Sequence, residues 1–168
     1  PEDVERMIAT ISSTLGDVDI LVNNAASALL KPFLEFTVEE WRSQLEYKAL
    51  AYFLTSRAVL PAMIRKRSGA IINLLSTVGM RGGAGEMGYA VTNGGAMALT
   101  RGLAAEIGQT GVRVNGVMLT WAENAFDPED PKHVAWLDRF AMGRVTKLDE
   151  VARVVAFLAS DEAGGVTG

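Results

Sequence analysis

The stretch Gly69-Ala-Ile-Ile-Asn-Leu-Leu-Ser76 decides the fold. Its central residues, 70–75, form a short apolar run, which is typical of a strand that is buried on both faces of a parallel sheet. Residues 20–23 (Ile-Leu-Val-Asn) and 112–118 (Val-Arg-Val-Asn-Gly-Val-Met) have the same character. The sequence therefore predicts three buried strands.

Segments with the apolar spacing of helices lie before, between and after these strands. A first helix is expected to end at Gly16, where the apolar periodicity stops. Thr37 and Glu40 make a capping-box pattern, which predicts a helix from 37 to about 66 with Pro61 bending its last turns. Loops are expected at 24–36 and 79–88, and further helices at 89–108, 133–140 and 147–160.

Strands that alternate with long helices predict a parallel α/β sheet that is covered on both faces. Three short strands against five helices would nevertheless leave sheet edges unpaired and helix faces uncovered. The mean hydropathy of +0.17 is also high for a small domain, which suggests surface that is meant to be covered. We therefore expect the later part of a larger α/β domain, and the first residue, Pro1, suggests a processed or truncated chain.

The composition excludes several classes of site. The chain has 168 residues and a net charge of −4, which argues against non-specific nucleic-acid binding. It contains no cysteine, so disulfides, thiolate metal sites and cysteine nucleophiles are excluded. A single histidine, His133, argues against a histidine metal site and Ser-His-Asp chemistry, and no metal is expected. No apolar run could span a bilayer and no secretory signal is present, so a soluble cytoplasmic protein is expected.

The segment Gly83-Ala-Gly-Glu-Met-Gly88 matches the dinucleotide-binding pattern G-x-G-x-x-G. In dinucleotide-binding folds this pattern follows a strand directly, so that backbone amides meet the pyrophosphate at a helix N-terminus. Here seven residues, 76–82, separate the pattern from the strand. A flexible loop is therefore the better interpretation.

Two hydroxyl groups flank this loop. Ser76 ends the second strand, where parallel α/β sheets place their ligands, and Tyr89 opens the next helix thirteen residues later. Taken singly, Ser76 is more simply interpreted as a strand-end hydroxyl, and Tyr89 as a packed aromatic. Together they suggest chemistry, because a tyrosine can exchange a proton with a carbonyl oxygen that a serine hydroxyl also hydrogen-bonds.

With these residues in place, the chain resembles the short-chain dehydrogenase/reductase family over nearly its whole length. The resemblance rests on Asp19-Ile-Leu-Val-Asn-Asn-Ala25, Gly69 to Ser76, the spacing from Ser76 to Tyr89, Arg113-Val-Asn115, and Phe157-Leu-Ala-Ser-Asp161 with Thr167-Gly168. It implies a Rossmann-like, doubly wound parallel sheet in three α/β/α layers. Residues 1–168 would form the central and C-terminal part of that single domain, without its N-terminal cofactor-binding part and its C-terminal strand.

The resemblance also implies an activity. It is hydride transfer between NAD or NADP and a small-molecule carbonyl or secondary alcohol, with Tyr89 as acid/base and Ser76 polarising the carbonyl. The implied cofactor contacts are Asn23, Ala25, Ala26, Tyr89, Asn93, Leu119, Thr120 and Asn124. Because the family's phosphate-binding loop lies upstream of Pro1, residues 1–168 alone are not expected to bind NAD(P)H appreciably. A homodimer or homotetramer is implied, with helices 37–66 and 89–108 in the subunit contact and no membrane partner.

The departures from the family's pattern are as informative as the matches. Four residues after Tyr89, where the family has a lysine that favours the phenolate, stands Asn93, and the family's helix asparagine aligns with Lys48. Either the two positions decayed independently, or the lysine and the asparagine of the family's proton relay have exchanged places. In that second case, which we call a swapped relay, Lys48 supplies the charge from the neighbouring helix. Ala26 replaces a glycine, Leu119-Thr120 replaces a Pro-Gly pair, and Asn124 stands where a threonine is common.

The segment around His133 resembles the family's mobile substrate lid. A surface histidine at a helix start is the simpler interpretation of His133, and the nearby aromatic residues hint at an apolar substrate. These residues are Trp121, Phe126, Trp136 and Phe140. Two alternatives to a dehydrogenase stay open, namely a catalytically impaired family member with a binding or assembly role, and a cofactor-independent lyase or isomerase.

Overall fold

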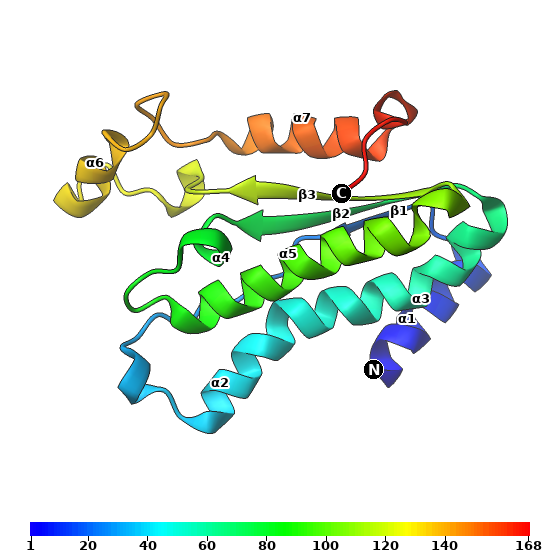
Figure 1. Cartoon of the computed structure of the whole chain (residues 1–168), viewed down its shortest axis with the longest axis horizontal. Coiled ribbons are helices and arrows are strands. Elements are labelled where there is room, and N and C mark those ends of the chain that lie inside the picture. Colours follow the sequence, from blue (N-terminus) through cyan, green and yellow to red (C-terminus); the bar gives the residue numbers. More distant parts are fainter.

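The computed structural model describes all residues, 1–168, and is built around a three-stranded parallel sheet (Figure 1). The strands are β1 (Ile20–Asn23), β2 (Gly69–Ser76) and β3 (Val112–Leu119), in the order β1-β2-β3. In the register, Asn23 lies beside Asn73, and Ser76 lies beside Leu119. The three predicted strands are confirmed, and their carboxyl ends form one edge of the sheet.

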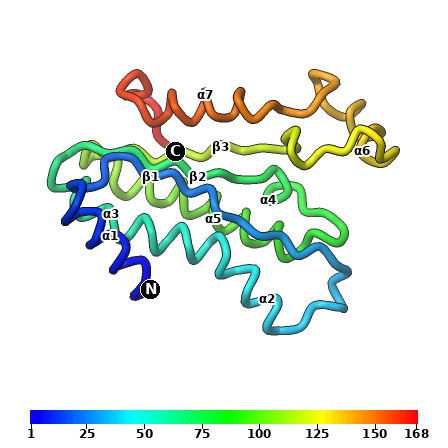
Figure 2. Tube along the Cα trace, turned by 180° about the vertical axis from the view of Figure 1, so that it is seen from behind, coloured from blue at the N-terminus to red at the C-terminus, as the bar shows by residue number.

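Helices cover both faces of the sheet, which confirms the doubly wound α/β class. The helices α1 (Glu2–Leu15), α3 (Ala51–Lys66) and α5 (Met87–Ile107) lie on one side, and α7 (Leu148–Ala159) lies on the other. Figure 2 shows the same division from behind. With only three strands, the outer edges of β1 and β3 have no strand partner, as expected of an incomplete fold. No helix of the chain is long and apolar enough to cross a membrane.

The predicted helix from Thr37 to Lys66 is present but is interrupted. Thr37 Oγ1 accepts from the Glu40 backbone N–H at 3.2 Å, and the Glu40 carboxylate accepts from the Thr37 N–H at 2.8 Å, so the capping box is confirmed. After α2 (Val38–Leu45) comes a π-helical turn, η2 (Glu46–Leu50), and only then α3. This wider turn was not predicted from the sequence.

Other boundaries also differ from the sequence-based prediction, and α5 begins at Met87, two residues earlier than predicted. The glycine-rich loop contains a short helix, α4 (Val78–Arg81). The helix α6 (Pro131–Leu137) begins two residues earlier than predicted, because Asp130 caps it by accepting from the Lys132 N–H at 2.8 Å. Pro131 fits this first turn, where no backbone donor is needed. Single 3₁₀ turns complete the chain at Phe33–Glu35 (η1), Gly108–Thr110 (η3), Glu123–Ala125 (η4) and Asp161–Ala163 (η5).

The apolar core consists of a layer on each face of β2, and this explains its uninterrupted apolar sequence. Ile71 packs with residues of α3, α5 and β3 in one cluster, and Ile72 packs with α7 residues in the other. On the α3/α5 face of the sheet, a chain of buried amide and hydroxyl groups runs from β1 through β2 to α5. Asn23 Nδ2 donates to Asn73 Oδ1 at 2.8 Å, and Asn73 Nδ2 donates to Thr100 Oγ1 at 2.8 Å. These bonds tie β1 to β2 and β2 to α5 just below the carboxyl edge of the sheet.

Candidate active site

The four candidate catalytic residues come together at the carboxyl edge of the sheet. Ser76 is the last residue of β2, and Tyr89 lies in the first turn of α5, with Asn93 one turn further along. Lys48 reaches the same place from the π-helical turn η2. Ser76 and Tyr89 are half-buried, whereas Lys48 and Asn93 are almost completely buried. The hydroxyl groups are therefore accessible, while the lysine and the asparagine act from beneath them.

Asn93 connects the other three residues. Its Oδ1 accepts from Lys48 Nζ at 3.0 Å and from the Ser76 backbone N–H at 2.9 Å, and its Nδ2 donates to the Tyr89 carbonyl at 2.8 Å. Buried polar groups in a fully satisfied network hold fixed positions. Asn93 therefore fixes the end of β2 relative to the start of α5, and fixes Lys48 relative to both.

The Lys48 ammonium is a buried cation without a carboxylate partner. Its Nζ donates to the Leu74 carbonyl at 2.9 Å as well as to Asn93, and lies 5.7 Å from the centre of the Tyr89 ring. Burial lowers the pKa of Lys48 from 10.5 to about 8, because desolvation disfavours the charged form. The positive charge is still present at neutral pH, close to the Tyr89 ring.

The π-helical turn is the local feature that accompanies the inward position of Lys48. A π turn has one residue more than an α turn, and such turns are frequent at functional sites. It leaves backbone groups without the regular helical pairing, and the Ala49 N–H donates instead to Thr92 Oγ1 of α5 at 3.2 Å. The turn is thus anchored to the helix that carries Tyr89 and Asn93.

Tyr52 belongs to the site, and the sequence analysis missed it. Its hydroxyl is buried and donates to the Leu74 carbonyl at 2.9 Å, the same oxygen that Lys48 uses, and the Tyr52 ring lies 5.6 Å from Lys48 Nζ. Desolvation, and secondarily the nearby Tyr89, raises the pKa of Tyr52. Tyr52 therefore stays neutral and supports Lys48, and Tyr89 is left as the accessible phenol.

With this geometry established, similarity to known proteins identifies the family. A family model described as "Enoyl-(Acyl carrier protein) reductase" matches residues 1–168. The 3-oxoacyl-[acyl-carrier-protein] reductase FabG of Vibrio cholerae is 38% identical over 170 residues, which cover 100% of this chain and 70% of that protein. A short-chain dehydrogenase/reductase structure from Burkholderia xenovorans superposes with a TM-score of 0.89 at 34% identity, over 99% of this chain and 66% of that one. The chain belongs to the short-chain dehydrogenase/reductase family.

A structure that was solved with a nicotinamide cofactor is also similar. The gluconate 5-dehydrogenase from Burkholderia cenocepacia, in complex with NADP and tartrate, superposes with a TM-score of 0.92 at 28% identity. The match covers 99% of this chain and 67% of that one. The chain thus spans about two thirds of the length of its short-chain dehydrogenase/reductase relatives.

The residues that the family resemblance assigns to the cofactor lie in three places. Ala25 and Ala26 are exposed just after β1, so their backbone is open to a ligand. Asn23 is buried, and its amide is bonded to Asn73 and to Thr55, whose Oγ1 donates to Asn23 Oδ1 at 2.8 Å. The amide of Asn93 is likewise used within the chain. These two asparagines therefore position the site in the structure, and their contact with a cofactor stays a prediction.

The remaining assigned residues follow β3. Leu119 ends the strand, and its carbonyl accepts from the Thr77 N–H at 2.9 Å, while Thr77 Oγ1 donates to Thr120 Oγ1 at 3.5 Å. The structure thus places Leu119 and Thr120 directly beside the residue that follows Ser76. Asn124 is exposed in the 3₁₀ turn η4.

Residues 121–146, which resemble the family's lid and are called the lid segment below, contain an aromatic cluster. His133 packs against Trp121 with ring centres 4.4 Å apart, and Trp136 stacks on Trp121 at 6.0 Å. His133 Nδ1 also accepts from the Asp127 N–H at 2.9 Å, so this histidine in the first turn of α6 is partly exposed and is held by packing and by a backbone contact.

Backbone contacts join the two ends of this lid. Thr146 donates its N–H to the Trp121 carbonyl at 3.1 Å, and its carbonyl accepts from the Glu123 N–H at 3.0 Å. Residues 122 and 146 consequently form a parallel bridge at the base of the lid.

Proposed function

We propose that the protein is an NAD(P)-dependent oxidoreductase that transfers a hydride between nicotinamide and a carbonyl or secondary alcohol, with a swapped relay. The observation that supports this proposal is the 3.0 Å contact between Lys48 Nζ and Asn93 Oδ1. The two residues that have changed places relative to the family are in direct contact, and the cation still lies 5.7 Å from the Tyr89 ring. The exchanged pair therefore keeps a cation beside Tyr89, which the swapped relay requires.

In this mechanism Tyr89 is the acid/base and Ser76 is the hydrogen-bond donor to the substrate oxygen. During reduction the Tyr89 hydroxyl gives its proton to the carbonyl oxygen, and during oxidation the phenolate removes a proton from the alcohol. Lys48 favours the phenolate through its positive charge, and Asn93 positions Lys48 and the ends of β2 and α5. Lys48 and Asn93 are thus positioning residues that lie beneath the reacting groups.

The exposed backbone of Ala25 and Ala26 and the Thr120 side chain fit a ligand at this edge, and we assign the nicotinamide half of NAD or NADP to them. The cofactor supplies or accepts the hydride. The relatives' names make 3-oxoacyl thioesters the first substrates to try.

Replacing Tyr89 by phenylalanine tests this proposal. In the protein at its full natural length, Tyr89→Phe is expected to lower kcat for NAD(P)H-dependent reduction by about 100-fold or more, because it removes the general acid. The Kd for NADPH, measured by cofactor fluorescence, should rise far less than kcat falls, because Tyr89 is only one of the implied cofactor contacts. Tyr47→Phe is the matched control, since Tyr47 is an exposed tyrosine next to Lys48 in the π-helical turn η2.

The outcome can also favour the alternatives. Wild-type protein that binds NADPH but turns over no aldehyde, ketone or 3-oxoacyl thioester would support the impaired family member. Turnover without any nicotinamide cofactor would support the lyase or isomerase.

We also propose a homodimer that forms through α3 and α5. Between these helices runs an apolar groove of about 470 Å³, lined by Phe53, Leu60 and Leu103 among others, with Arg57 and Glu106 at its margins. Ser56 lines the same groove, and its buried hydroxyl has no hydrogen-bond partner within the chain. A two-fold contact would cover this surface and let Arg57 approach Glu106 of the partner subunit.

Sedimentation velocity tests the dimer. At a protein concentration of about 10 µM, the wild type is expected to be dimeric or tetrameric. Phe53→Glu is expected to be monomeric, because it places a charge in the apolar groove. Phe33→Glu, at another exposed phenylalanine, should leave the assembly intact. A monomeric wild type, or equal effects of both changes, would contradict this contact.

Three statements about the whole protein stay predictions from the sequence. They are the cytoplasmic location, the membership of residues 1–168 in one larger domain, and the absence of appreciable NAD(P)H binding by these residues alone.

A further inference from the structure

A pocket of about 310 Å³ lies beside the candidate active site, beyond the carboxyl end of β3. Thr120 and Trp121 line it on the strand side, and Arg139 and Arg144 line it on the lid side. Thr120 also contacts Thr77, the neighbour of Ser76. The pocket therefore lies on the same edge of the sheet as Ser76, without being lined by it, and it contains two arginines.

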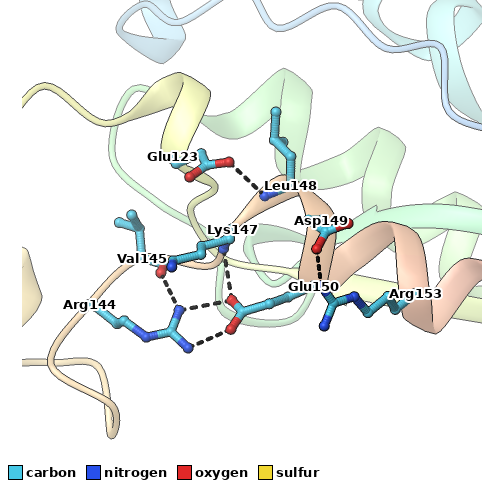
Figure 3. A network of polar contacts seen from close by, with 8 residues as sticks. All are labelled: Glu123, Arg144, Val145, Lys147, Leu148, Asp149, Glu150 and Arg153. Carbon is cyan, nitrogen blue, oxygen red and sulfur yellow. Dashed lines mark hydrogen bonds and ion pairs between the residues drawn. The ribbon is translucent and has the colours of Figure 1, made fainter.

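Only one of these two arginines is available to a ligand. Figure 3 shows that both terminal nitrogens of Arg144 are taken by the Glu150 carboxylate, at 2.8 and 2.6 Å. Glu150 also accepts from the Lys147 N–H at 2.9 Å at the start of α7. Arg144 is accordingly a structural residue that fixes the end of the lid to α7, and its charge is neutralised.

Arg139 has no such partner. No carboxylate lies within 4.0 Å of it, and its guanidinium donates no hydrogen bond within the chain. Its central carbon lies 4.6 Å from the centre of the Trp136 ring. Stacking on an indole orients the flat guanidinium while its N–H groups stay free in its plane, which is the arrangement that binds a carboxylate or phosphate in bidentate fashion.

A second arginine also lies near Trp136, but a carboxylate neutralises its charge. Arg81, from α4, lies 5.4 Å from the same ring, but it pairs with Glu86 at 3.3 Å. The stacked indoles of Trp121 and Trp136 add an apolar surface next to the free cation. The pocket thus offers an apolar wall and one unpaired guanidinium, at the sheet edge that also carries Ser76.

We propose that Arg139 binds an oxyanion carried by the substrate, so that the substrates are anionic carbonyl compounds with a carboxylate or phosphate group. This inference rests on the proposed function, and it deepens that function by naming the substrate class. Arg139 is a specificity-determining residue, and it takes no part in the proton transfer.

Intrinsic tryptophan fluorescence tests the binding directly, since Trp121 and Trp136 lie in or beside the pocket. The probes are acetoacetate, its uncharged methyl ester and inorganic phosphate. The variants are Arg139→Gln, Arg139→Lys and the control Arg42→Gln, which removes an exposed arginine from α2 on the opposite side of the molecule (Figure 1). Loss of a charge-assisted hydrogen-bonded pair is expected to weaken acetoacetate binding by about 10-fold or more in Arg139→Gln.

The other arms have definite expected results. Arg139→Lys should bind acetoacetate more tightly than Arg139→Gln but less tightly than the wild type. Arg42→Gln should bind acetoacetate as the wild type does, and the Arg139 variants should bind the methyl ester as the wild type does. If phosphate competes more strongly than acetoacetate and depends equally on Arg139, the substrate's oxyanion is a phosphate. In steady-state kinetics, Arg139→Gln should raise KM for the oxo acid about tenfold with kcat unchanged, because a uniform binding contact is lost.

Two results would overturn the inference. One is equal binding of acetoacetate and its methyl ester by the wild type, and the other is an effect of Arg139→Gln that is confined to the Kd for NADPH. Failure of the proposed function is distinguishable from both. It would appear as Arg139-dependent binding of the oxo acid without any NAD(P)H-dependent turnover.

Discussion

A Lys48→Met variant is expected to oxidise secondary alcohols at least about 100-fold more slowly than the wild type at pH 7. The cation 5.7 Å from the Tyr89 ring favours the phenolate, and methionine fills a similar volume without the charge. Initial rates of alcohol oxidation at pH 7 measure this effect, with the wild type as the reference.

Exchange of the two residues provides the control for this prediction. Asn93→Lys alone would place two ammonium groups in one small site, and their repulsion should also lower activity. The double variant Lys48→Asn/Asn93→Lys restores the arrangement of the family, so its activity should exceed that of either single variant, which is a non-additive result. If Asn93→Lys alone raised activity and Lys48→Met had little effect, position 93 would simply have decayed, and the swapped relay would be wrong.

The same Lys48→Met variant is expected to be more stable than the wild type at pH 7, by about 1–3 kcal/mol. The folded chain holds the pKa of Lys48 at about 8, and the ordinary value is 10.5. Between these pH values the unfolded state binds more protons than the folded state, so the folded wild type gains stability as the pH rises. The cost of burying the charge is therefore complete below pH 8 and fades toward pH 10.5.

Two features of the site make this gain in stability reachable. When Lys48 is replaced, the Asn93 oxygen still accepts from the Ser76 N–H, and the Leu74 carbonyl still accepts from the Tyr52 hydroxyl. No buried acceptor is left without a partner, and an apolar side chain replaces a desolvated ammonium.

Urea unfolding at pH 7 and at pH 10 tests this prediction. The stability difference between Lys48→Met and the wild type should be largest at pH 7 and should fall to about a quarter of that value at pH 10. Lys132→Met, at an exposed lysine of α6, should show no such pH dependence. A variant that is less stable than the wild type at pH 7 would show that the two hydrogen bonds of Lys48 outweigh its desolvation.

Local signals made much of the fold predictable from the sequence. The apolar run before Ser76 and the capping box at Thr37 each follow from short-range physical chemistry, and both are confirmed. The start of α6 was placed too late because the capping role of Asp130 was not considered, although the Asp-Pro pair is a visible signal. The π-helical turn has no such signal, since it is accompanied by tertiary contacts such as the one between Ala49 and Thr92.

The candidate site was predictable to a different degree. Ser76 and Tyr89 stand at positions that any parallel α/β sheet would expose, so their residue types suggested a role. The contact between Lys48 and Asn93 spans 45 positions of the sequence and became visible only in the folded chain. Tyr52 was missed because it lies within a long helix, where nothing in the sequence distinguishes a hydroxyl that faces a strand carbonyl from one that faces solvent.

The bridge between residues 122 and 146 has a consequence for how substrate preference can diverge. Because the two ends of the lid are fastened to each other, the segment between them is a closed module whose length and composition can change without displacing β3 or α7. The entropy of closing such a loop grows only with the logarithm of its length, so insertions there cost little stability. Residues of this segment that would contact the substrate, such as Arg139, can therefore be replaced during evolution without moving the residues that we assign to proton transfer.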